Sequence, residues 1–147
     1  MENYGSDQNH DRGHHGVSHK LEVLSGWHVG PRYELVKYIG EGSYGQVAKA
    51  IDVRSGEPVA IKRIDSVFDN ATDCKHLLRE LILLKKLNHA SIVRLLNVLI
   101  GDDDGDLENF NEIYLVMSYS TSDLRKLSQS NIALNITQIK SIIRSLT

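Results

Sequence analysis

Three glycines at residues 40, 42 and 45 follow the spacing G-x-G-x-x-G, and Val47 comes shortly after them. A backbone without side chains at such positions can approach a phosphate group closely and point its N–H groups at the oxygens. The bound phosphates would also need a fixed positive charge, and Lys62 ends the short run Val-Ala-Ile-Lys at residues 59–62. These residue types predict a site for a ligand that carries phosphate groups.

A glutamate further along the chain is predicted to complete this site. Glu80 lies three residues after Leu77 and four before Leu84, so it shares the apolar face of a helix with two leucines. A carboxylate in that place needs a positively charged partner, and Lys62 is the expected one. The alternative is an ion pair at the surface with a residue such as Lys85.

The elements around the glycines decide between two kinds of phosphate loop. In a dinucleotide-binding unit the glycines lead into a helix, and Asp65, 20 residues beyond Gly45, would bind the ribose. In a flap over the phosphates of ATP, they join two antiparallel strands, and the next strand carries the lysine. Residues 46–53 are rich in β-branched side chains and are followed by Ser-Gly-Glu-Pro, which is typical of a strand and a turn. The sequence therefore favours the flap.

Periodicity predicts the other elements. Strands are expected at 33–39, 46–53, 59–64, 91–100 and 111–117, and helices at 70–88 and 135–147, capped by Asn70 or Thr72 and by Asn135. The acidic stretch 101–110 is expected to be a solvated hairpin connection. It is not an EF-hand, because Gly105 in the sixth position would put Ile100 in the first ligand position.

Composition narrows the range of functions. The 147 residues suit one compact unit, and a net charge of −2 without a basic patch argues against nucleic acid as a partner. The single cysteine, Cys74, excludes an internal disulfide framework, and no apolar run is long enough to span a membrane. Residues 1–26 are expected to be a disordered tail whose histidines form no fixed metal site. The expected location is the cytosol or the nucleus.

Four ordered motifs together resemble the N-terminal lobe of eukaryotic protein kinases. The stretches VGPRYELVKYIGEGSYGQVAKAID and LLRELILLKKLNHASIVRLLNVL are similar to the extracellular-signal-regulated branch of the mitogen-activated protein kinases, and the resemblance covers about residues 28–147. It implies an α+β fold: a five-stranded antiparallel sheet with the family's αC helix, then the hinge and the first C-lobe helices only. The implied divisions are 27–117 for the N-lobe and 118–147 for the hinge and the start of the C-lobe.

The resemblance also implies roles for single residues. Lys62 would hold the phosphates of ATP with Glu80 as its ion-pair partner, and Met117 would stand at the gatekeeper position. The Ser118 carbonyl and the Ser120 amide would face the adenine edge, and Asp123 would bind the ribose hydroxyls. Ile39, Val47 and Ala60 would enclose the adenine, and the flap as a whole would comprise Ile39, Gly40, Glu41, Gly42, Ser43, Tyr44, Gly45, Gln46 and Val47.

The implied activity is that of a serine/threonine kinase that uses ATP and Mg²⁺ and phosphorylates protein substrates. An upstream kinase is implied as its partner. The chain contains no H-R-D or D-F-G motif, so the ligands of Mg²⁺ and the catalytic aspartate are not in this chain, and it is expected to be inactive alone. The alternative is a non-catalytic fragment that competes for partners. Its basis is an apolar stripe after Asn135, formed by Ile136, Ile139, Ile142, Ile143 and Leu146.

Overall fold

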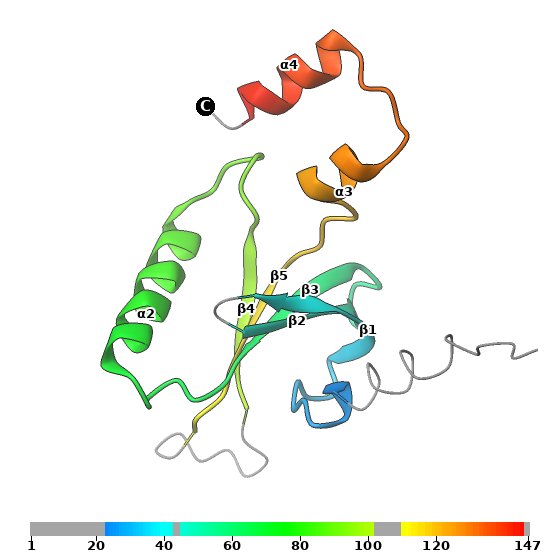
Figure 1. The fold of residues 1–147 in the computed structure, drawn as a ribbon. Helices are drawn as coiled ribbons and strands as arrows, with labels where there is room; N and C mark the ends of the chain where they lie inside the picture. The colour runs from blue at the N-terminus through cyan, green and yellow to red at the C-terminus, as the bar shows by residue number, and fades with distance from the viewer. Residues whose placement is uncertain (1–22, 43–44, 102–109, 146–147) are drawn as a thin grey trace, which may run out of the picture.

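The computed structural model describes residues 23–42, 45–101 and 110–145, and its centre is a five-stranded antiparallel sheet with the strand order β1-β2-β3-β5-β4 (Figure 1). The strands are β1 (Tyr33–Gly42), β2 (Gly45–Asp52), β3 (Pro58–Ile64), β4 (Leu95–Ile100) and β5 (Ile113–Ser118). The helices are α2 (Ala71–Lys86), α3 (Leu124–Gln129) and α4 (Ile136–Arg144). The α+β fold class predicted from the sequence is confirmed. None of the helices within the described ranges is long and apolar enough to cross a membrane.

The first three strands form two successive hairpins, as predicted. β2 pairs antiparallel with β1 on one side and with β3 on the other. The β2–β3 turn closes through hydrogen bonds from the Gly56 N–H to the Asp52 carbonyl (2.8 Å) and from the Asp52 N–H to the Glu57 carbonyl (3.0 Å). The segment after the third glycine is therefore extended, and the dinucleotide-binding alternative, which needs a helix there, is wrong.

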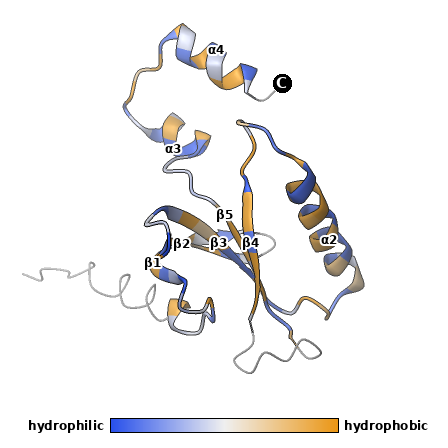
Figure 2. Cartoon of the chain, turned by 180° about the vertical axis from the view of Figure 1, so that it is seen from behind, coloured by the Kyte–Doolittle hydropathy of each residue, from blue (hydrophilic) through white to orange (hydrophobic). Residues whose placement is uncertain are grey.

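Helix α2 begins after one of the two residues predicted as its N-cap. The Asn70 side chain accepts a hydrogen bond from the Thr72 N–H (2.8 Å), so Asn70 and not Thr72 is the N-cap. Leu77 is buried against Ile113 and Leu115 of β5, and Leu81 packs at the edge of this cluster. Figure 2 shows the resulting contrast between the apolar and polar sides of the helix.

A second core lies on the other face of the sheet and contains the segment before β1. Trp27 packs with its ring centroid 5.8 Å from that of Tyr114, and Leu24 is buried in the same cluster. The predicted tail extended to residue 26, but a buried leucine at position 24 places the last residues of that range in the folded part. The apolar side chains of Leu24 and Trp27 provide the reason. Residues 1–22 of the predicted tail lie outside the described residues.

The predicted and observed bounds of most elements differ by a few residues, and β4 and α3 show the largest differences. β4 begins at Leu95 instead of residue 91, because residues 89–92 form a turn in which the Ile92 N–H bonds to the His89 carbonyl (3.1 Å) and the Ser91 N–H bonds to the His89 ring (3.1 Å). Helix α3 was not predicted as a separate element. Most of the acidic connection, residues 102–109, lies outside the described residues.

Helices α3 and α4 follow β5 and lie beyond its end, away from the sheet (Figure 1). Helix α4 starts with a capping box, in which Asn135 and Gln138 each bind the other's backbone N–H through their side chains (both 2.9 Å). The predicted cap at Asn135 is thus confirmed.

Candidate functional site

The glycine motif forms the tip of the β1–β2 hairpin, where Gly42 pairs with Gly45. Ser43 and Tyr44 lie outside the described residues. Gly45 has a φ of +131°, and a Cβ atom there would lie 2.1 Å from the carbonyl oxygen of Arg63. Only glycine fits this position, because both the backbone angle and the space exclude a side chain. The hairpin tip is therefore in direct backbone contact with β3, the strand that carries Lys62.

Lys62 and Glu80 meet as the sequence predicted. The Lys62 Nζ lies 2.9 Å from each carboxylate oxygen of Glu80, and the two side chains are 15% and 35% exposed. The surface alternative with Lys85 is thus wrong. A hydrogen bond to a charged group contributes about 1.5–3 kcal/mol, more than an exposed ion pair. The ammonium group is therefore fixed between the sheet and α2.

Strand register gathers four of the predicted residues on the face that carries Lys62. Ala60 and Lys62 are two residues apart on β3 and so face the same side. Val47 is directly opposite Lys62, and Met117 is directly opposite Ala60. Ile39 lies at a register shift of β1 between Tyr38 and Gly40 and is 40% exposed. The structure thus brings Val47, Ala60, Lys62 and Met117 together and leaves Ile39 at the edge.

The predicted hinge residues follow the end of β5. The Ser118 N–H donates to the Arg94 carbonyl (2.9 Å), and its hydroxyl accepts from the Arg94 N–H (3.1 Å), which anchors the start of this segment. The Ser120 hydroxyl donates to the Ser122 carbonyl (2.9 Å). Asp123 caps α3, and the hydrogen bond from the Lys126 backbone N–H (2.7 Å) is the main cause that holds its pKa below the usual range. Its proposed contact with a ribose stays a prediction.

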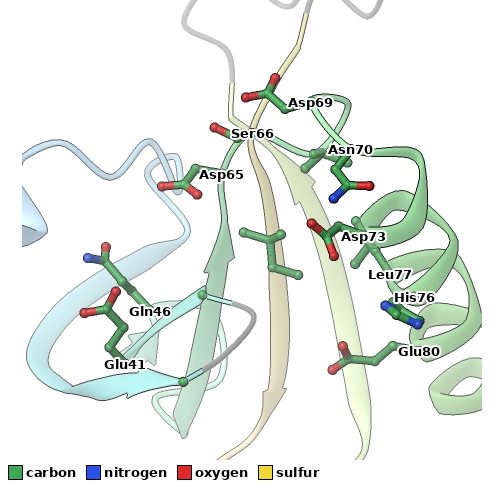
Figure 3. A pocket seen from close by; sticks show the side chains of 14 residues that line it. Glu41, Gln46, Asp65, Ser66, Asp69, Asn70, Asp73, His76, Leu77 and Glu80 are labelled. Carbon is green, nitrogen blue, oxygen red and sulfur yellow. The ribbon is translucent and has the colours of Figure 1, made fainter.

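A pocket of about 560 Å³ lies between the hairpin tip, the end of β3 and the first turns of α2 (Figure 3). Its walls include Glu41, Gly42, Gly45, Gln46 and Glu80 from the predicted site. Lys62, Ala60 and Met117 are not in its lining, so this hollow lies beside the predicted phosphate loop and not where the adenine is predicted. Carboxylates are common in its lining, namely those of Asp65, Asp69 and Asp73 in addition to Glu41 and Glu80.

These carboxylates determine what a phosphate-bearing ligand would need at this end of the site. They would repel a bare polyphosphate, so the charge of Lys62 and a divalent cation carried by the ligand would have to offset them. Within residues 23–42, 45–101 and 110–145, no group of three or more His, Cys, Asp or Glu side chains is placed to hold a metal ion.

Sequence reasoning missed the contacts on the opposite face of β3. Arg63 forms an ion pair with Glu112, which lies just before β5. The signal was present in the strand alternation, since a charged residue next to Lys62 must face the other side of the sheet. Its partner is 49 positions away in the sequence, however, and only the adjacency of β3 and β5 brings it into contact.

Comparisons with known proteins agree on one family. A family model described as "Protein kinase domain" matches residues 33–147. "Mitogen-activated protein kinase 9" of Arabidopsis thaliana is 38% identical over 118 residues, which cover 80% of this chain and 22% of that protein. "Mitogen-activated protein kinase 13" of Bos taurus is 41% identical over 101 residues, which cover 69% and 27%. "Mitogen-activated protein kinase 12" of Oryza sativa subsp. japonica is 36% identical over 112 residues, which cover 76% and 19%. The chain thus spans between 19% and 27% of the length of these relatives.

Proposed function

This chain belongs to the protein kinase domain family, as its resemblance predicted, and from that premise we propose that it binds ATP with the triphosphate between the glycine hairpin and Lys62. The observation that carries this proposal is the ion pair of Lys62 with Glu80, 2.9 Å long, on the strand against which the hairpin tip is seated. A lysine fixed by a carboxylate can present its positive charge to phosphate oxygens in one defined place.

The other residues are assigned by their place around this lysine. Val47 and Ala60 would cover the faces of the adenine together with Ile39, and Met117 would limit the depth of the pocket. The Ser118 carbonyl would accept, and the Ser120 N–H would donate, a hydrogen bond at the adenine edge. Asp123 would bind the ribose hydroxyls. The predicted division into a lobe at 27–117 and a hinge with the start of a second lobe at 118–147 belongs to the same proposal, with the start of the lobe moved back to include Leu24.

In a longer protein of the mitogen-activated type, the bound ATP would be the phosphoryl donor for a serine or threonine of a protein substrate. The hydroxyl oxygen forms a bond to the γ-phosphorus, the bond from that phosphorus to the β–γ bridging oxygen breaks, ADP leaves, and a base takes the hydroxyl proton. Mg²⁺, when bound, neutralises charge on the phosphates. Because the sequence has no H-R-D or D-F-G motif, we propose that this chain positions the nucleotide and does not itself supply the base.

The nucleotide proposal is tested by calorimetric titration of the 147-residue chain with MgATP. Lys62→Met should weaken binding about tenfold or more, since it removes a charge-assisted hydrogen bond. Lys85→Met is the matched control, because Lys85 lies in the last turn of the same helix that carries Glu80 and points to solvent. The proposal is wrong if the unmodified chain does not bind MgATP, or if both variants weaken it equally. Phosphoryl transfer by the unmodified chain would contradict the proposal that this chain does not itself supply the base.

A second candidate function is that of a non-catalytic fragment which competes for the partners of a complete kinase. It is favoured by the exposed apolar side of α4, where Ile136, Ile139 and Ile143 are 71%, 42% and 55% exposed. Co-purification and light scattering test it. A chain that stays monomeric and captures no kinase partner, with or without Ile139→Glu and Ile143→Glu, would exclude this candidate.

A further inference from the structure

A chain of polar contacts runs across the sheet face opposite Lys62. The Arg63 guanidinium forms an ion pair with one carboxylate oxygen of Glu112, and the other oxygen accepts a hydrogen bond from the Tyr114 hydroxyl (2.7 Å). That hydroxyl in turn accepts from the backbone N–H of His28 (3.0 Å). The Arg63 and Glu112 side chains are 20% and 23% exposed, and Tyr114 is fully buried. These contacts therefore join three separate segments of the polypeptide in a region largely screened from water.

At one end of this series of contacts, the Arg63 backbone lies beside the hairpin tip, on the neighbouring strand. The carbonyl of Arg63 occupies the space where any side chain at position 45 would lie, with only 2.1 Å to an added Cβ. Gln46 is directly opposite Arg63 in the β2–β3 register. Because Gly45 rests on the Arg63 backbone without a side chain between them, a displacement of Arg63 is passed on to the hairpin tip.

The Arg63 backbone is paired with β2 and β5, and its side chain is held by Glu112. The Arg63 Nε is buried and has no hydrogen-bond partner in the part of the chain that the structure describes, so the guanidinium has already lost water at one donor. Burial alone would raise the pKa of Glu112, but the hydrogen bonds from Arg63 and Tyr114 hold it below its usual range. Removing one member would leave the other buried charge without compensation, and the end of β3 would have to move to hydrate it.

Glu112 is bound through both its carboxylate and its backbone. The Tyr114 hydroxyl donates to the carboxylate (2.7 Å), and Gly101 packs so close to Glu112 and Tyr114 that a Cβ at position 101 would collide with both. Gly101 also donates its N–H to the Glu112 carbonyl (3.0 Å). Glu112 therefore links the Arg63 side chain to Tyr114 and to the backbone of Gly101.

We propose that Arg63 is a positioning residue. Held by Glu112, it sets the position of Gly45 relative to Lys62, at the end of the site where the phosphates are proposed to bind. The expected effect on ligand binding rests on the proposed nucleotide function, whereas the expected effect on the hairpin does not. The Arg63 side chain faces the side of the sheet opposite Lys62. Its loss should therefore affect the phosphate end of the site and leave the adenine end unchanged.

The test compares Arg63→Met, Glu112→Gln and the conservative Arg63→Lys in the full chain. Arg32→Met is the matched control: Arg32 also forms a buried-carboxylate ion pair, with Asp52 (2.7 Å), but at the far end of β2 from the hairpin tip. Two quantities are measured for each variant. The first is the hydrogen-exchange rate of the backbone amides at 45–47, and the second is the affinity for MgATP relative to adenosine.

Arg63→Met and Glu112→Gln should speed exchange at 45–47 about tenfold over any change in Arg32→Met. They should weaken MgATP binding about fivefold or more while adenosine binding changes less than about twofold. Arg63→Lys should recover part of both effects because it keeps a cation beside Glu112.

Unchanged exchange at 45–47 in Arg63→Met, or equal changes in Arg32→Met, would overturn the inference. So would an equal loss of affinity for MgATP and adenosine. If the unmodified chain binds neither ligand, the nucleotide function fails, and the exchange rates alone still decide whether Arg63 positions the hairpin.

Discussion

Lys62 and Arg63 are neighbours on β3, and each finds a different carboxylate because their side chains face opposite sides of the sheet. Lys62 meets Glu80 of α2, and Arg63 meets Glu112 before β5. All four side chains are at least partly buried, unlike the pair of Lys126 and Asp123, whose side chains are 60% and 55% exposed. Two adjacent residues thus tie one strand to a helix on one face and to a neighbouring strand on the other.

At the residue scale, Gly45→Ala should destabilise the fold by about 2 kcal/mol or more, because alanine is strained at a positive φ and its methyl group would collide with the Arg63 carbonyl. Gly40→Ala is the control, since no atom lies within 4 Å of the place of its Cβ. Urea unfolding of both variants measures the difference. Equal stability of the two variants would mean that the hairpin tip is not seated on β3.

At the scale of elements, the start of α2 fixes where Glu80 lies. Glu80 is ten residues after Asn70, or about three helical turns, so the carboxylate reaches Lys62 only if the first turns are formed. Leu77 is the one buried residue of this helix. Because so little of α2 is buried, we expect its N-cap to contribute an important part of its stability. The existence of α2 could be predicted because it depends on residues three or four positions apart, and its cap could be narrowed to Asn70 or Thr72 from residue type alone.

Asn70→Ala should lower the free energy of unfolding by about 1 kcal/mol, since it leaves the Thr72 N–H without its acceptor. Asn70→Asp should retain most of that stability, because aspartate is an equally good N-cap and its charge is favourable at a helix N-terminus. The measurement is the urea midpoint of each variant, with helix content followed by circular dichroism. A loss of equal size in both variants would contradict the capping role.

For the whole molecule, the segment before β1 is part of the fold through its contacts with the back of the sheet. Trp27 packs on Tyr114, the Tyr114 hydroxyl binds the His28 N–H, and Arg32 pairs with Asp52 at the end of β2. The structure places this segment beside residues 86 positions further along the chain. No local pattern predicts such a contact, and this is why the predicted tail extended too far.

Tyr114 gives this arrangement a measurable pH dependence. Burial, with the hydrogen bond to Glu112, raises the pKa of Tyr114 to about 12, whereas a tyrosine in the unfolded chain titrates near 10. A folded-state pKa above the unfolded one means that stability is fully present below pH of about 10 and is lost as the pH rises through about 12. The chain should therefore unfold more easily across this window.

Tyr114→Phe should lose less stability over the same window but be about 1–2 kcal/mol less stable at neutral pH, because His28 and Glu112 each lose a partner. The fluorescence of Trp27, the single tryptophan, reports urea unfolding as a function of pH. Parallel pH profiles for the variant and the unmodified chain would contradict the assignment.

The sequence by itself determined the hairpins of the first three strands, the start of α2, the cap of α4 and the family resemblance, since each depends on residue types at short, regular spacing. It also indicated Lys62 and Glu80 as partners, because an acidic residue on an apolar helix face needs one. Only the tertiary structure decided that Gly45 rests on Arg63 and that Arg63 is held by Glu112. The Gly45 contact follows from the exact register of β2 on β3. The Glu112 contact follows from the insertion of β5 between β3 and β4, an arrangement set by the packing of side chains far apart in the chain and not by any local pattern.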